Sequence, residues 1–162
     1  LGIGVFWLVL ILGFVGFKEY TLRTGKEVLL KLQPVDPRDL FRGDYVILNY
    51  DISDINLETP EAFQENDTIY VRLKLNGNVA EFDGASNARP LDGLFIAGTV
   101  TDVSGNNLDV TYGIESYFVP EGEGREIERV REGMYAKIAI DASGRSVVKS
   151  LVLDGKEITF KK

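Results

Sequence analysis

The chain has 162 residues, with 18 Lys plus Arg against 25 Asp plus Glu and a formal net charge of −7. This length allows one ordinary domain with a hydrophobic core, plus an appendage. The acidic balance argues against a nucleic-acid binder, which needs a basic face, and against polybasic docking on anionic lipids. The chain has no His and no Cys, which excludes a Ser-His-Asp triad, a cysteine nucleophile and a His/Cys zinc site. We predict no metal and no cofactor.

Residues 1–17 contain only Leu, Ile, Val, Phe, Trp and Gly. A helix that crosses a bilayer core needs about 20 apolar residues, and the usual range begins near 17. Lys18, Glu19 and Tyr20 follow as a polar end with an aromatic anchor. The sequence therefore predicts a transmembrane or assembly helix over residues 1–18 and a β-rich domain over residues 19–162, with the membrane contacted through residues 1–17.

Two other interpretations of the apolar run fit less well. A cleaved signal peptide would have a shorter apolar core and a small-residue cleavage site, which residues 14–18 do not offer. A buried core helix would have a polar face to turn toward water. The chain begins at Leu1 rather than Met, so we expect further residues upstream.

The rest of the chain has the pattern of short strands joined by Gly, Asn and Asp turns. Residues 68–75 alternate apolar and polar side chains, and Asn76-Gly77 is a strong hairpin signal. Short helical pieces are predicted over residues 60–64, capped by Thr59, and over residues 126–131. The predicted strands are residues 27–33, 45–50, 68–75, 79–82, 93–102, 108–112, 134–141, 146–153 and 157–160. Strands spaced this closely predict a mainly β barrel- or sandwich-like domain of about eight or nine strands.

A proline-rich, charged loop precedes the second predicted strand. Pro34 and Pro37 hold its backbone extended and prevent a helix, and Gly43 then permits a sharp bend. The charged side chains of the loop are Asp36, Arg38, Asp39 and Arg42. Because arginine–carboxylate pairs commonly fix loops, we expect a structural ionic cluster here rather than a catalytic pair of carboxylates.

Two segments carry a family signature. Residues 43–50 read Gly-Asp-Tyr, two residues, Leu, one residue, Tyr, and residues 117–122 read Tyr-Phe-Val-Pro-Glu-Gly. In this order, and with the lead-in at residues 34–42, they resemble the bacterial GDYXXLXY family over most of the chain after about residue 18. The residues expected to be structural or to bind a partner are Asp36, Pro37, Arg38, Asp39, Arg42, Gly43, Asp44, Tyr45, Leu48, Tyr50, Tyr117, Pro120, Glu121 and Glu128.

The resemblance implies a bacterial envelope protein that is anchored in the inner membrane, with a β-rich domain in the periplasm or outside the cell. It implies no particular reaction. Arginine charges are rarely left unpaired in a folded interior. We therefore hypothesise that the two signature turns meet, with Glu121 or Glu128 accepting hydrogen bonds from Arg38 or Arg42 and a tyrosine, Tyr45 or Tyr117, packed alongside. Such a cluster would lock the domain's shape or form the floor of a partner-binding groove.

The sequence favours a binding or assembly module over an enzyme. The expected partner is another protein or a further copy of the chain, and not nucleic acid. One alternative is a subunit of a filament or envelope scaffold, built through the apolar N-terminal helix. Another is a membrane-tethered hydrolase with a Ser–Lys dyad. The first serine, Ser53, lacks the Ser-Met-x-Pro context of the signal peptidases, which use such a dyad.

Overall fold

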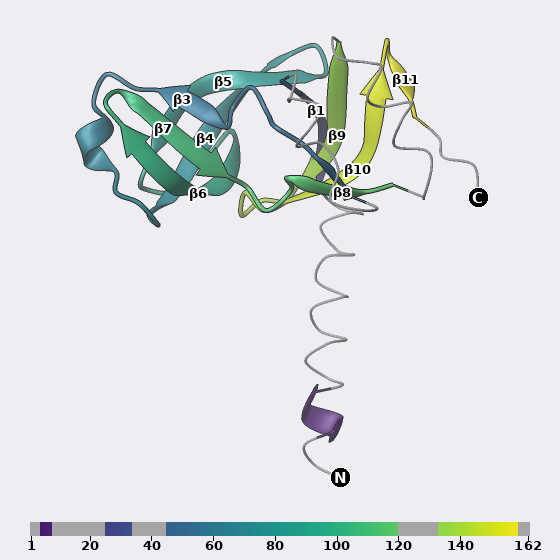
Figure 1. Ribbon diagram of the computed structural model, residues 1–162, viewed down its shortest axis with the longest axis horizontal. Coiled ribbons are helices and arrows are strands. Elements are labelled where there is room, and N and C mark those ends of the chain that lie inside the picture. Colours follow the sequence, from purple (N-terminus) through teal and green to yellow (C-terminus); the bar gives the residue numbers. More distant parts are fainter. Residues whose placement is uncertain (1–3, 8–24, 34–44, 120–132, 159–162) are drawn as a thin grey trace.

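The computed structural model describes residues 4–7, 25–33, 45–119 and 133–158, and these residues are mainly β (Figure 1). Nine strands form one mixed sheet, and two strands form a separate ribbon. A 3-10 turn, η1 (Pro60–Ala62), lies between β3 and β4. The strands are β1 (Lys26–Lys31), β2 (Tyr45–Ile47), β3 (Asp54–Asn56), β4 (Thr68–Asn76), β5 (Val79–Ser86), β6 (Leu94–Ser104), β7 (Asn107–Thr111), β8 (Ser116–Phe118), β9 (Met134–Ile140), β10 (Ser146–Leu153) and β11 (Lys156–Glu157).

The nine strands form one continuous, open sheet in the order β11-β10-β9-β1-β5-β4-β6-β7-β3. The predicted closed barrel is therefore wrong for the described part of the chain, whereas the predicted mainly β class is confirmed. Both end strands are short and carry charge: β3 contains Asp54, and β11 consists of Lys156 and Glu157. Short, charged edge strands resist further pairing, which explains why the sheet does not close.

The sheet has two halves that meet at one short seam. In Figure 1, β3, β4, β6 and β7 lie in the left half, and β1, β9, β10 and β11 lie in the right half. The seam is the parallel pairing of β1 with β5, which extends over only Leu29 with Val79 and Leu30 with Ala80. The other pairings within the sheet are antiparallel.

The sequence pattern explains the long strands. In β4, Ile69, Val71 and Leu73 are buried and alternate with more exposed side chains, as expected for a strand with one face on the core. Gly77 follows with a φ of +63°, which is the left-handed conformation that a two-residue hairpin turn needs. The predicted β4–β5 hairpin is thus confirmed.

Several predicted boundaries were less accurate. The strand predicted over residues 45–50 ends at Ile47, and β3 was not predicted, because Asp and Asn are disfavoured in strands. Thr59 makes no side-chain capping hydrogen bond to η1, so its predicted capping role is wrong. The helix predicted over residues 126–131 lies outside the described residues.

Only residues 4–7 of the apolar N-terminal helix predicted over residues 1–18 are described, and they are helical. Within the described ranges, no helix is long and apolar enough to span a membrane.

A loop of the right half makes a second contact with the left half, apart from the β1–β5 seam. Gly144, in the β9–β10 turn, accepts a hydrogen bond at its carbonyl from the Ala97 amide of β6, at 2.8 Å. Its φ is +85°, and a Cβ atom added there would lie 2.7 Å from the Phe95 ring. Asp141 holds the turn in shape, because its carboxylate accepts from the Ser143 amide at 2.8 Å. This turn therefore has no room for a side chain at Gly144.

We predict that Gly144→Ala destabilises the domain by roughly 2–4 kcal/mol, because it combines a left-handed backbone with overpacking against the Phe95 ring. Gly105→Ala is the matched control, since Gly105 has a φ of +59° and nothing within 4 Å of an added Cβ. Urea denaturation of both variants measures the difference. Equal losses of stability would contradict the close packing of the β9–β10 turn on β6.

Candidate functional site

The two-stranded ribbon brings the two signature segments together. β2 and β8 are antiparallel, with Tyr45 opposite Phe118 and Val46 opposite Tyr117. Val46 is buried in the core, whereas Tyr45 and Phe118 are 50% and 57% exposed and make an edge-to-face contact at 5.6 Å between ring centroids. The ribbon is therefore amphipathic, with Val46 and the half-buried Tyr117 toward the core and an aromatic pair on the surface.

Four of the predicted site residues lie in the described part of the chain. Tyr45 is on the surface, Leu48 and Tyr50 are in the core, and Tyr117 is half-buried. Burial raises the pKa of Tyr117, and the nearby charge of Glu157 adds to the effect. The other predicted residues lie outside the described ranges: Asp36, Pro37, Arg38, Asp39, Arg42, Gly43, Asp44, Pro120, Glu121 and Glu128. The hypothesis that Arg38 or Arg42 pairs with Glu121 or Glu128 thus stays a prediction.

Tyr50, the last residue of the first signature, takes part in a reciprocal pair of hydrogen bonds. Its hydroxyl donates to the Ile114 carbonyl at 2.7 Å, and the Tyr112 hydroxyl donates to the Ile52 carbonyl at 2.5 Å. Both tyrosines are buried, and we call this arrangement the tyrosine clasp. It joins the segment between β2 and β3 to the segment between β7 and β8.

Further backbone contacts surround the clasp. The Leu48 amide donates to the Glu115 carbonyl at 2.8 Å, and the Val110 amide donates to the Ser53 carbonyl at 2.8 Å. The Tyr112 amide donates to the Glu115 carboxylate. The two linking segments are thus tied together on both sides of the tyrosines, although neither segment is a strand.

Sequence reasoning identified Tyr50 but missed Tyr112. A signal was present, because Tyr50-Asp51-Ile52 and Tyr112-Gly113-Ile114 share the pattern Tyr-x-Ile, the first shortly after β2 and the second directly after β7. In each copy the tyrosine donates to the isoleucine carbonyl of the other copy. The repeated pattern predicts a symmetrical contact only once the two segments are known to be neighbours.

A groove lies where the two halves of the sheet diverge. It has a volume of about 460 Å³. β1 contributes Leu30 and Lys31, and the segment between β2 and β3 contributes Asp51 and Ile52. The other lining residues are Asn76, Val79, Ala80, Glu81, Phe82 and Tyr135. The groove therefore combines aromatic side chains with acidic and basic ones.

One wall of the groove is a strand edge. β5 pairs with β1 only as far as Ala80, so from Glu81 to Ser86 this edge of β5 has no strand partner among the described residues. Phe82 is 40% exposed beside it. An unpaired edge of this kind presents backbone donors and acceptors that can pair with another chain.

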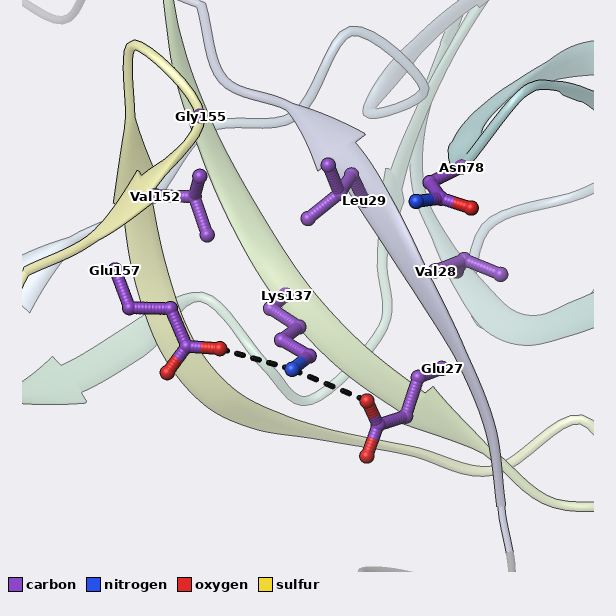
Figure 2. Close-up of a pocket in the computed structure, with 8 residues that line it drawn as sticks. All are labelled: Glu27, Val28, Leu29, Asn78, Lys137, Val152, Gly155 and Glu157. Carbon is purple, nitrogen blue, oxygen red and sulfur yellow. Dashed lines mark hydrogen bonds and ion pairs between the residues drawn. The ribbon is translucent and has the colours of Figure 1, made fainter.

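A second pocket, of about 310 Å³, is lined by an ion-pair network (Figure 2). The Lys137 ammonium lies between two carboxylates, 3.1 Å from Glu27 and 2.8 Å from Glu157. Glu27 also pairs with Lys149, and this contact, followed by the one with Lys137, lowers the pKa of Glu27. Exposed pairs of this kind contribute little stability. Because these charges are satisfied within the protein, the network serves chiefly to align β1, β9, β10 and β11.

The same network bears on the Ser–Lys alternative. Ser150 and Lys137 are cross-strand partners, so their side chains lie on one face of the sheet. A lysine that acts as a base needs a lowered pKa. The hydrogen bond to Glu157, and then that to Glu27, instead raises the pKa of Lys137. This pair therefore does not have the electrostatics of a catalytic dyad.

No group of three or more acidic residues in the described ranges is arranged to hold a metal ion.

We predict that Tyr50→Phe destabilises the domain by roughly 1–3 kcal/mol, because it leaves the buried Ile114 carbonyl without its donor. Tyr112→Phe should have a similar cost for the Ile52 carbonyl. Denaturant titration of both single variants and the double variant gives their coupling energy. Tyr45→Phe, at an exposed position, is the control and should change stability by less than about 0.5 kcal/mol. If a clasp variant is as stable as this control, the tyrosine hydroxyl groups do not stabilise the domain and the prediction is wrong.

The clasp also predicts a loss of stability at alkaline pH. Burial, with a smaller effect from Glu115, raises the pKa of both Tyr50 and Tyr112 above the ordinary value. The stabilisation is complete below about pH 10, where the unfolded tyrosines also keep their protons. Above it, the unfolded chain releases those protons first, so the free energy of unfolding falls by about 1.4 kcal/mol per pH unit for each tyrosine.

The measurement is denaturant titration between about pH 9 and pH 11, the range around the ordinary tyrosine pKa. Tyr50→Phe/Tyr112→Phe should show a shallower decline than the native protein. All other titrating groups are common to both, so identical slopes would show that the two phenols ionise freely in the folded state.

Comparison with known proteins supports the signature resemblance. No curated protein and no solved structure matches the chain. The sequence does match the GDYXXLXY protein family over residues 7–151, which is most of the chain. The chain therefore belongs to the GDYXXLXY family.

Proposed function

We propose that this protein is a membrane-anchored binding or assembly module whose β domain lies outside the cytoplasm. The observation that carries the binding role is the unpaired edge of β5 beside the groove of about 460 Å³. The occupant best suited to this edge is an extended segment of a partner protein, which would add a strand to β5. In this mode the backbone supplies affinity and the side-chain pockets supply specificity.

The N-terminal apolar run supports the anchor. Val5, Phe6 and Trp7 are 57%, 62% and 57% exposed. In Figure 1 the purple turn that contains them lies well below the sheet, and none of them belongs to the core cluster. Exposed apolar side chains need a partner outside the domain, and residues 1–17 have the length and composition that a bilayer requires.

The charges of the groove suggest the chemistry of the partner. Lys31 pairs with Asp51 at 3.3 Å, so its charge is already neutralised. Glu81 is neutralised by no cation among the described ion pairs, so the charged side chains that line the groove carry a net negative charge. A groove with surplus negative charge favours a basic segment. Phe82 and Tyr135 would contact its apolar side chains.

The filament or scaffold alternative rests on the same exposed residues as the anchor. Val5, Phe6 and Trp7 could pack against copies of the chain as well as against lipid. Self-association would then be the assembly role of the protein. The hydrolase alternative is the least supported, because the pKa of Lys137, the lysine that faces Ser150, is raised.

We expect a chain that begins at Lys18 to stay in solution and to melt cooperatively, because the described residues of the apolar run, 4–7, do not belong to the core cluster. Circular dichroism and thermal melting test this expectation. The full chain is the control, and it should sediment with lipid vesicles whereas the shortened chain should not. A shortened chain without a cooperative melt would show that the apolar run belongs to the core of the domain.

The binding role is tested by panning the shortened chain against a random peptide library. We expect enrichment of Lys- and Arg-containing peptides with alternating apolar residues. Phe82→Ser and Glu81→Lys should weaken the selected peptides about tenfold or more, which corresponds to about 1.4 kcal/mol. Leu91→Ser, at a fully exposed position away from the groove, is the control. Equal binding of the selected peptides to Phe82→Ser and to the native protein would show that the groove is not their binding site.

A further inference from the structure

The exposed face of the β2–β8 ribbon is unusual for this acidic chain. The Tyr45 side chain is half exposed and the Phe118 side chain is slightly more exposed, and the two rings contact each other edge to face. The six residues of the two strands include no charged side chain, although the chain carries a net charge of −7. Adjacent exposed aromatic side chains in an uncharged patch are more typical of a contact surface than of a surface in free solution.

The position of the ribbon indicates what it contacts. In Figure 1, β8 lies along the lower edge of the domain, on the side where the purple turn of residues 4–7 is found. Residues 18–24 are the chain between the apolar run and the described start of the domain at Gly25. Even fully extended, these residues reach no more than about 25 Å. A domain held on so short a connection lies close to the bilayer that holds residues 1–17.

We propose that Tyr45 and Phe118 rest in the interfacial layer of the same bilayer and so form a second, peripheral membrane contact. This inference rests on the proposed membrane anchor. Aromatic side chains favour the headgroup region, where the ring is desolvated and the tyrosine hydroxyl stays hydrated. The absence of charge on the ribbon also avoids repulsion between an acidic domain and anionic headgroups. The contact would fix the orientation of the domain and leave the groove beside β5 accessible to a partner.

Fluorescence quenching tests the contact, because Trp7 is the only tryptophan of the chain. The full chain is placed in phosphatidylcholine vesicles that contain lipids brominated near the headgroup, for the ribbon, or deep in the acyl chains, for Trp7. In a Trp7→Phe background, Phe118→Trp moves the single reporter to the ribbon, and Tyr45→Trp provides a second position. Phe82→Trp, on exposed β5, is the matched control.

We expect the fluorescence of Phe118→Trp and Tyr45→Trp to fall in brominated vesicles by an amount approaching the loss seen for Trp7 in the native chain. The emission of Phe82→Trp should stay unchanged. The inference is wrong if Trp7 is quenched but the tryptophans of Phe118→Trp and Tyr45→Trp are quenched no more than that of Phe82→Trp. In that case the membrane anchor stands, and the ribbon faces water or another protein. If Trp7 itself is unquenched, the proposed anchor fails.

Discussion

The tyrosine clasp is the contact on which the arrangement of this domain most depends. β2 and β8 belong to a ribbon outside the main sheet, whereas β3 and β7 form one end of that sheet. The two segments that connect ribbon and sheet have no strand ladder of their own, so they are held by backbone hydrogen bonds on either side and by side chains between them. These side chains are Tyr50 and Tyr112, whose buried hydroxyl groups are each bonded to a carbonyl of the opposite segment. Leaving such carbonyls unpaired would cost more than the hydrogen bonds contribute when formed.

Tyr50 also connects the clasp to the other half of the sheet. It forms a β-bridge with Leu32 just beyond β1, and the Asp51 amide donates to the Lys31 carbonyl at 3.1 Å. Asp51 and Ile52 then line the groove where β1 and β5 diverge. One buried tyrosine thus links the ribbon, the end of the sheet and a wall of the proposed binding groove. This role gives a physical reason for a tyrosine at the last position of the Gly-Asp-Tyr signature.

Local signals in the sequence predicted much of the secondary structure. Alternation in β4 and the Asn76-Gly77 turn are local properties, and the structure confirms both. The parallel β1–β5 seam and the open ends of the sheet were not predictable in this way, because they depend on contacts between distant segments. β3 was missed because its single buried residue, Ile55, lies between Asp54 and Asn56. The clasp required knowledge that residues 50–52 and 112–114 are neighbours.

The candidate site, too, was predictable from the sequence only in part. The sequence drew attention to the charged loop at residues 34–44, whereas the groove depends on where the unpaired edge of β5 meets β1 and the clasp. Phe82 carries no signal of its own in the sequence. Its significance comes from exposure beside an unpaired strand edge, which only the arrangement of the sheet shows.

Residue-resolved hydrogen exchange in the native protein tests the central role of the clasp most directly. The Leu48 and Val110 amides donate to carbonyls of the opposite segments on either side of the tyrosines. If the clasp holds these segments as described, both amides should be as protected as those in the centre of β4 and should open with the global unfolding of the domain. Tyr50→Phe should speed the exchange of both amides while the amides of β4 and β6 stay protected. Exchange of the Leu48 amide at the rate of an exposed loop in the native protein would contradict the account.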